Sequence, residues 1–252
     1  MKYIFLHIPK NGGTTLQHII DHQYKKYQIY NIPDSIREES LLKLKNKNFL
    51  QKKRIKIVKG GHFNYGCHLY FSRPENVKYF AFLRHPLSRA ISYYSYVKRT
   101  PQHYLHSTII SESISLEDFL DRSDLNFEIC NGQTKLIAGI DQDKQCNEED
   151  FKMALTHLSN SFFFVGIMER YQESLFILKK KLSWHKPIRY QILNVNNNDE
   201  YKISSEISKK LLSMNNYDLK IYNTYLEVFH EITRSFDLEE FNEFKKSLRT
   251  KT

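Results

Sequence analysis

The chain has few cysteines, and the three it has form no recognisable pattern. Cys67, Cys130 and Cys146 are widely spaced among 252 residues. Their spacing matches neither a zinc site nor a disulfide framework, so we expect reduced thiols. His18 and His22 lie one helical turn apart, but no third ligand stands near them. No metal site is therefore expected.

Long hydrophobic runs are also lacking. Nothing in the sequence approaches the roughly 18 consecutive apolar residues that a membrane-spanning helix needs. The apolar start is short and lacks the basic region and cleavage site of a secretory signal. No Gly-, Ser- or Pro-rich linker and no internal repeat divides the chain. We expect one cytoplasmic domain over residues 1–252, with a charged tail that frays after about residue 244.

Negative charge is scarce relative to positive charge. The chain has 28 acidic residues against 38 lysines and arginines, a formal net charge of +10. This surplus favours an anionic partner, such as a nucleotide, an acidic polysaccharide, a nucleic acid or an anionic lipid surface. Because the cations are dispersed along the chain, the pattern argues against a nucleic-acid-binding protein. The 17 tyrosines and 17 phenylalanines are typical of a packed core.

Apolar runs of strand length alternate with helical patterns. The runs cover residues 3–8, 55–59, 79–84 and 162–167, and residues 188–193 are a candidate edge strand. Residues 31–53 are polar and suggest one or two exposed helices. The alternation predicts an α/β fold with a mainly parallel sheet of four or five strands flanked by helices. Ligands bind at the carboxyl edge of such a sheet, so the residues after each strand are the candidates for a site.

The first 16 residues predict an anion site. A strand is ended by Pro9, a glycine pair permits a tight turn, and Thr14 or Thr15 caps a helix that continues to about Tyr27. Free N–H groups and the positive end of the helix dipole would face a phosphate or sulfate there. The candidate residues are Lys10, Asn11, Gly12, Gly13, Thr14 and Thr15. A Walker A loop does the same work, but its lysine follows the glycines, whereas here the lysine precedes them.

Two further strand ends carry polar residues. His62 follows Gly60-Gly61 after the second predicted strand, on the same edge as the glycine loop. Arg84 leaves the third strand, and Arg89 and Ser92 share one face of the helix that follows. An arginine and a serine in this arrangement can together bind a phosphate.

These motifs resemble those of the PAPS-dependent carbohydrate sulfotransferases (PAPS is 3′-phosphoadenosine-5′-phosphosulfate), particularly the heparan-sulfate 2-O/6-O and related bacterial group. The two specific motifs are HIPKNGGTT (residues 7–15) and FLRHPLSRAISYY (residues 82–94). The supporting motifs, which follow the expected order over most of the chain, are GGHFNYG (60–66), NGQTKLIAG (131–139), FVGIMERYQESL (164–175) and NNYDLKIY (215–222).

The resemblance implies a P-loop-NTPase-like fold and a role for each matched residue. Residues 10–15 are similar to the loop that binds the 5′-phosphosulfate of PAPS, and Arg84 and Ser92 are similar to the pair that holds the 3′-phosphate. His62 is similar to the family's candidate general base, and Gln133 and Lys135 are candidate substrate contacts. The family needs no metal for the transfer itself.

The expected reaction is an in-line attack by a hydroxyl group on the sulfur of PAPS, with no metal required. Lys10 and the loop amides would stabilise the charge that builds on the departing PAP oxygen, and His62 would accept the hydroxyl proton. The acceptor implied by the resemblance is a carbohydrate. Two alternatives stay open at this point: an ATP-dependent small-molecule kinase, and a non-catalytic basic protein that binds nucleic acid or polysaccharide. His68 and Glu169 are the next candidates for the base.

Overall fold

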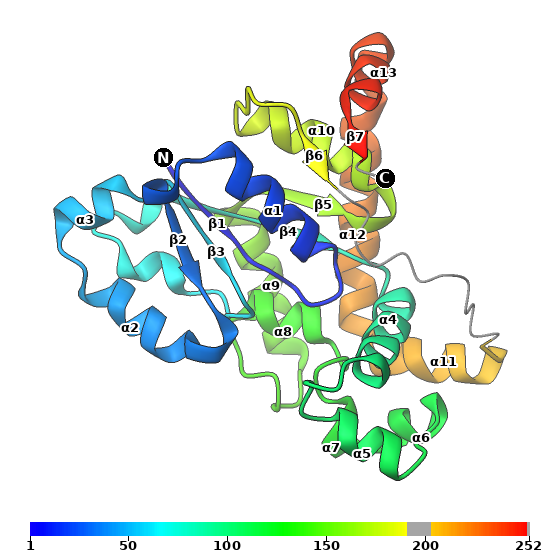
Figure 1. The fold of residues 1–252 in the computed structure, drawn as a ribbon. Helices are drawn as coiled ribbons and strands as arrows, with labels where there is room; N and C mark the ends of the chain where they lie inside the picture. Colours follow the sequence, from blue (N-terminus) through cyan, green and yellow to red (C-terminus); the bar gives the residue numbers. More distant parts are fainter. Residues whose placement is uncertain (191–202, 251–252) are drawn as a thin grey trace.

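The computed structural model describes residues 1–190 and 203–250, which form a single α/β domain. Its centre is a five-stranded sheet in the order β2-β3-β1-β4-β5, in which every neighbouring pair is parallel (Figure 1). The strands are β1 (Lys2–Phe5), β2 (Ile29–Ile32), β3 (Ile57–Gly60), β4 (Val77–Leu83) and β5 (Phe162–Ile167). The predicted fold class is thus confirmed. At the centre of the sheet, Ile4 of β1 pairs with Val58 of β3 on one side and with Tyr79 of β4 on the other.

Helices flank this sheet and connect its strands (Figure 1). They are α1 (Gly13–Gln23), α2 (Arg37–Asn46), α3 (Phe49–Arg54), α4 (Pro86–Arg99), α5 (His106–Ser111), α6 (Leu116–Asp121), α7 (Ser123–Asn126), α8 (Gly132–Ala138), α9 (Glu148–Ser161), α10 (Tyr171–Lys181), α11 (Ser205–Met214), α12 (Asn216–Arg234) and α13 (Leu238–Ser247). Of the helices in the described ranges, none is long and apolar enough to cross a membrane.

The edges of the sheet differ from the prediction. The sequence pattern missed β2, a four-residue strand that follows a 3₁₀ helix (Lys26–Gln28). The candidate strand at 188–193 does not join the main sheet. Its described part is β6 (Arg189–Tyr190), which pairs with β7 (Arg249–Thr250), and residues 191–193 lie outside the described residues. Helix α1 also ends at Gln23 rather than near residue 27.

Two clusters of buried hydrophobic residues support the fold. The larger cluster surrounds the sheet and includes side chains of α1, α10, α12 and α13. At its margin, α13 continues beyond residue 244, where we expected fraying, and buries Phe244 with its ring centroid 5.3 Å from that of Phe176. The smaller cluster lies among α4–α7 and α11 and includes Tyr93, Phe119 and Leu211.

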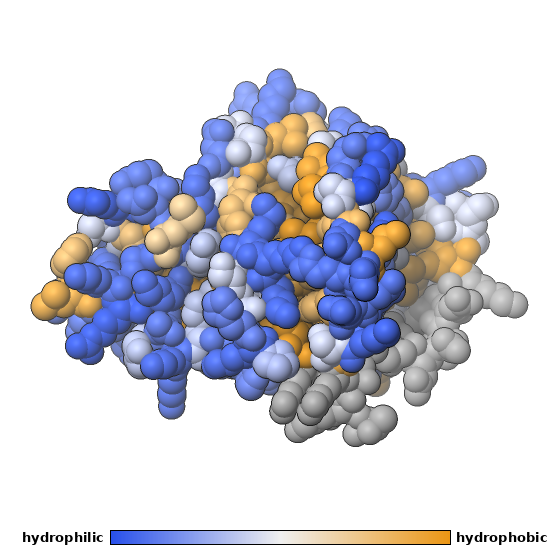
Figure 2. Space-filling view, turned by 90° about the horizontal axis from the view of Figure 1, so that it is seen from above, coloured by the Kyte–Doolittle hydropathy of each residue, from blue (hydrophilic) through white to orange (hydrophobic). Residues whose placement is uncertain are grey.

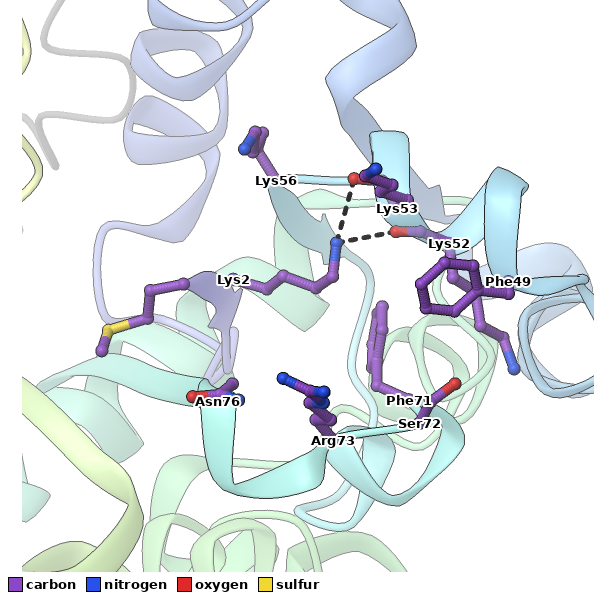
Figure 3. Close-up of a pocket in the computed structure, with 10 residues that line it drawn as sticks. Lys2, Phe49, Lys52, Lys53, Lys56, Phe71, Ser72, Arg73 and Asn76 are labelled. Atoms are coloured by element: carbon purple, nitrogen blue, oxygen red, sulfur yellow. Dashed lines mark hydrogen bonds between the residues drawn. The ribbon is translucent and has the colours of Figure 1, made fainter.

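A separate cleft lies at each end of the parallel strands. A cleft of about 760 Å³ lies at the carboxyl ends, beside the predicted anion loop. A second cleft of about 420 Å³ lies at the amino ends, where Lys2 begins β1 and Asn76 precedes β4 (Figure 3). Seen from above Figure 1, the surface is largely hydrophilic, with hydrophobic side chains near the middle and at the left margin (Figure 2).

Candidate functional site

The predicted anion loop connects β1 to α1 and leaves helix N–H groups available. Lys10 and Gly12 have positive φ angles of 69° and 75°, which turn the backbone back toward the start of the helix. Gly12 is the N-cap, and as a glycine it has no side chain to accept a hydrogen bond from the first N–H groups of the helix. The prediction that Thr14 or Thr15 caps α1 is therefore wrong, because the turn places both threonines inside the helix. Uncapped N–H groups at a helix start are suited to an anion.

The glycine pair is required by close packing, of Gly13 against His7 and of Gly12 against Met168. A Cβ atom on Gly13 would lie 1.9 Å from Cδ2 of His7, and one on Gly12 would lie 2.6 Å from Sδ of Met168. His7 is buried, and its Nδ1 lies 3.1 Å from the carbonyl oxygen of Gly60. Burial lowers the pKa of His7 to about 3, so its ring stays neutral. The neutral ring thus supports the loop between the ends of β1 and β3.

A buried amide network fixes the back of the loop. Asn11 Nδ2 donates to the carbonyl oxygen of Phe82 at 2.6 Å and to Oε1 of Gln133 at 2.8 Å. Gln133 also accepts from the backbone N–H of Arg84 at 3.0 Å and donates to its carbonyl oxygen at 2.9 Å. Arg84 Nη1 in turn donates to the carbonyl oxygen of Lys10 at 2.9 Å. The loop and the end of β4 are therefore held in one arrangement.

This network gives three of the predicted site residues a structural role. The side chains of Gln133 and Asn11 are 0% and 2% exposed, and both are engaged in the hydrogen bonds of the network. Lys135, the other predicted substrate contact, is also buried, and its ammonium donates to the carbonyl oxygens of Phe127 and Gln142. Their motif was recognisable in the sequence, but the side chains serve the framework of the site.

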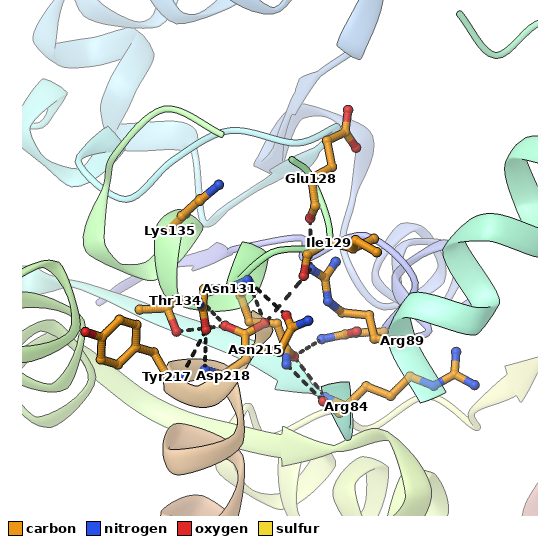
Figure 4. A network of polar contacts seen from close by, with 12 residues as sticks. Arg84, Arg89, Glu128, Ile129, Asn131, Thr134, Lys135, Asn215, Tyr217 and Asp218 are labelled. Atoms are coloured by element: carbon orange, nitrogen blue, oxygen red, sulfur yellow. Dashed lines mark hydrogen bonds and ion pairs between the residues drawn. The ribbon is translucent and has the colours of Figure 1, made fainter. Parts of the chain in front are cut away.

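Asp218 of α12 anchors the same motif from below (Figure 4). Its Oδ1 accepts from the N–H and the hydroxyl group of Thr134, both at 2.7 Å, and its Oδ2 accepts from the N–H of Gln133 at 3.2 Å. The guanidinium of Arg89, which is 1% exposed, lies 4.0 Å from the same carboxylate. Arg89 is consequently a buried partner of Asp218 and donates to the backbone of Glu128 at 2.9 Å.

His62 is paired with a carboxylate that the sequence analysis missed. The N–H of His62 donates to Oδ1 of Asp34 at 2.6 Å, and Nδ1 of its ring lies 3.3 Å from the same oxygen. Burial opposes the ionisation of Asp34, but the hydrogen bonds and charge of His62 outweigh it and lower the pKa of Asp34 to about 2. A Cβ on Gly61 would lie 2.1 Å from Oδ1 of Asp34, so the glycine permits this approach. Asp34 follows β2, and no sequence signal marked it because that strand was itself missed.

Lys10 points toward the aromatic wall of the cleft. Its ammonium nitrogen lies 4.0 Å from the centroid of the Tyr96 ring, a cation–π contact. Burial, with the nearby charges of Arg99 and Arg84, lowers the pKa of Lys10 to about 8. Lys10 is therefore a cation at neutral pH whose charge is sensitive to mildly alkaline conditions.

The 760 Å³ cleft brings Lys10, Thr14 and His62 together. Aromatic and polar side chains from α4 and the segment after it form the facing wall, namely Tyr93, Tyr96, His103, Tyr104 and Glu128. Tyr104 donates its hydroxyl to Oε1 of Glu128 at 2.8 Å. Tyr93 lies in the motif at residues 82–94, but the other wall residues had no distinguishing signal in the sequence, because only the fold brings them to the cleft.

The remaining predicted residues lie outside this cleft. Arg84 is half-buried at the end of β4, and Ser92 is buried on α4. Neither is among the described residues that line the cleft, nor are the reserve candidates His68 and Glu169. Glu169 accepts from the N–H of His85 at 2.9 Å, and His68 Nδ1 lies 3.0 Å from the hydroxyl of Tyr79. No group of three or more potential metal ligands was found within residues 1–190 and 203–250.

Comparison with known proteins places this site in context. The mouse sulfotransferase SULT7A1, solved as a complex with PAP, is similar over 84% of this chain, with 18% identity and a TM-score of 0.41. The aligned region spans 64% of the mouse chain. No curated protein sequence matches significantly. A sequence model of the sulfotransferase family matches residues 1–225, which include the loop, His62 and the amide network. The chain therefore belongs to the sulfotransferase family.

Proposed function

We propose that residues 1–252 form one sulfotransferase domain that transfers the sulfuryl group of PAPS to a hydroxyl group of a carbohydrate. One observation carries the proposal: the cleft at the carboxyl edge joins the glycine loop, Lys10 and His62. Family membership supports the reaction class. The geometry supports different roles for these residues, with the loop and Lys10 binding the donor and His62 acting on the acceptor.

The donor would bind with its 5′-phosphosulfate on the loop. The uncapped N–H groups of α1 and the hydroxyl of Thr14 can donate to its oxygens, and the Lys10 ammonium can reach this end of the cleft. Arg84 and Ser92 are the proposed partners of the 3′-phosphate. Because Gln133 bonds to both Asn11 and Arg84, the loop and the proposed 3′-phosphate partner are held by one side chain.

His62 is the proposed general base. When Nδ1–H faces Asp34, Nε2 is the unprotonated nitrogen and can accept a proton from the acceptor hydroxyl. The hydroxyl oxygen then forms a bond to sulfur while the bond from sulfur to the bridging oxygen of PAP breaks. His62 carries the released proton, and Lys10 and the loop amides stabilise the charge on PAP. Asp34 acts as a positioning residue that sets the tautomer of His62.

The acceptor would lie against the wall formed by α4 and the segment that follows it. Its tyrosine rings present flat apolar surfaces with polar edges, an arrangement suited to a sugar ring with several hydroxyl groups. This supports the carbohydrate class.

Thermal unfolding with PAP, ATP and an oligonucleotide in parallel tests the donor. A ligand at 100 times its Kd adds about 2.7 kcal/mol to the free energy of unfolding. We expect stabilisation by PAP and transfer of labelled sulfate from PAPS to a carbohydrate. Stabilisation by ATP without PAP would favour the kinase, which shares the phosphate-binding cradle, and stabilisation by the oligonucleotide alone would favour a nucleic-acid-binding protein.

A further inference from the structure

The cleft at the amino edge of the sheet is separate from the proposed sulfotransferase site. It has a volume of about 420 Å³ and lies between the start of β1, helix α3 and the segment before β4 (Figure 3). Its lining residues are Met1, Lys2, Phe49, Lys52, Lys53, Lys56, Phe71, Ser72, Arg73 and Asn76. None of these residues lines the 760 Å³ cleft, so an inference about this surface is independent of the proposed function.

The charged residues that line the cleft are all cationic. Five of its lining residues are lysine or arginine, and none is aspartate or glutamate. Lys2 donates to the carbonyl oxygens of Lys52 at 2.7 Å and Ile55 at 2.6 Å, so it holds the end of α3. Burial lowers the pKa of Lys2, and the nearby charge of Lys56 lowers it further.

Three of the cations remain available to an external anion. Within the described parts of the chain, the side chains of Lys53, Lys56 and Arg73 form no hydrogen bond or ion pair, and all three are exposed. The side chain of Arg73 points toward the space that Lys2 and Phe71 also face (Figure 3). The hydroxyl of Ser72 adds a neutral donor at the same place, whereas the amide of Asn76 donates to Oε1 of Glu75 at 3.4 Å.

Exposed hydrophobic side chains stand at the rim of this basic surface. Phe49, which lines the cleft, is 65% exposed, and Leu50 beside it is 69% exposed. Leu50 lines a second hollow, in which Lys47 and Arg54 are the charged lining residues. Figure 2 shows hydrophobic side chains at the left margin, the end of the molecule occupied by α2 and α3.

The combination of exposed cations and exposed hydrophobic side chains favours a lipid surface over other polyanions as the partner. Cations attract any polyanion, but exposed phenylalanine and leucine gain free energy only where they leave water. Segments that bind a membrane interface combine basic residues for anionic head groups with large apolar residues that enter the acyl boundary. A soluble acidic polysaccharide would leave Leu50 in water.

We propose that helix α3 and the basic cleft beside it form a docking surface for an anionic membrane. The cleft receives a phosphate-bearing lipid head group, and Phe49 and Leu50 insert at the level of the upper acyl chains. Since the donor loop lies at the opposite edge of the sheet, docking in this way leaves the 760 Å³ cleft open to the aqueous side.

Co-sedimentation of the full chain with vesicles tests the proposal. We expect binding to vesicles of phosphatidylcholine and phosphatidylglycerol in equal parts, weakened by salt, and little binding to phosphatidylcholine alone. Each cation near such a surface contributes about fivefold in affinity, so the double variant Lys53→Gln and Lys56→Gln should bind about 25-fold more weakly. The matched control is Lys152→Gln with Lys209→Gln, which removes the same charge from exposed sites on α9 and α11 and should bind like the unmodified chain.

A second pair of variants tests insertion. Phe49→Ser with Leu50→Ser keeps every charge and, because both side chains are exposed, should keep the melting temperature while reducing vesicle binding. Equal binding to neutral and anionic vesicles, or an equal loss in the control pair, would overturn the proposal. Binding to soluble dextran sulfate without binding to vesicles would also overturn it and would indicate a polysaccharide site.

Discussion

Replacement of Asp34 tests whether His62 works as a base held by a carboxylate. Asp34 accepts the N–H of His62 at 2.6 Å and lies 3.3 Å from its Nδ1. In Asp34→Ala both contacts are lost, and the ring is free to rotate or to adopt the other tautomer. We expect kcat to fall while the Kd for PAP stays unchanged, because Asp34 acts on the donor only through His62.

The structure sets the size of this effect. A hydrogen bond to a charged group contributes about 1.5–3 kcal/mol. The Asp34 side chain is 58% exposed, so water screens it and the lower end applies. About 1.4 kcal/mol corresponds to a tenfold loss in kcat. His62→Ala removes the base itself and should cost roughly 100-fold. Asp34→Asn keeps an oxygen acceptor for the N–H of His62, and we expect it to fall between the unmodified chain and Asp34→Ala.

A double-mutant cycle distinguishes positioning from a general loss of structure. In the background of His62→Ala, the change Asp34→Ala should cost nothing further, because the residue that it positions is already absent. Sulfate transfer under saturating PAPS gives kcat, and equilibrium titration gives the Kd for PAP. An undiminished tenfold loss in the double variant would refute the reasoning, as would normal turnover by His62→Ala on any accepted substrate.

Other predictions concern the loop and its support. Because the pKa of Lys10 is about 8, its positive charge is present below that pH and lost above it, so the affinity for PAP should fall as pH rises through about 8. Lys10→Arg should move this loss to higher pH in a binding titration, and Lys10→Ala should weaken both PAP binding and transfer by about tenfold. Gly13→Ala places a Cβ 1.9 Å from the His7 ring and should cost about 2 kcal/mol of unfolding free energy in urea and most of the affinity for PAP. Gln133→Ala leaves the N–H of Arg84 unpaired in the interior and should lower the unfolding free energy by about 3 kcal/mol, also measured in urea.

Features set by neighbouring residues could be predicted from the sequence. The glycine loop was recognisable because a strand, a turn and a helix follow one another within 16 residues, and each has a local signal. The strands β4 and β5 were recognisable for the same reason, since burial on both faces produces continuous apolar runs. The start of α4 at Pro86 also follows from local chemistry, because proline suits the first helical turn.

Features that depend on partners distant in the chain could not be predicted from the sequence. The strand β2 has four residues and is defined by its pairing with β3, so Asp34 at its end carried no signal. The role of Gln133 depends on Asn11, 122 positions away in the chain. A motif can thus reveal that a residue matters without showing whether its side chain faces a ligand or the interior.

The two hydrophobic clusters give this protein a separable architecture. The glycine loop and His62 are built on strands whose side chains belong to the larger cluster. Tyr93 belongs to the smaller cluster, and the other wall residues lie on α4 or in the segments that connect the helices of that cluster. Substitutions in the helical cluster can reshape one wall of the cleft while the sheet and its loop keep their packing. A graft of residues 93–128 between relatives is accordingly the natural unit for altering the proposed acceptor wall while the loop and His62 stay in place.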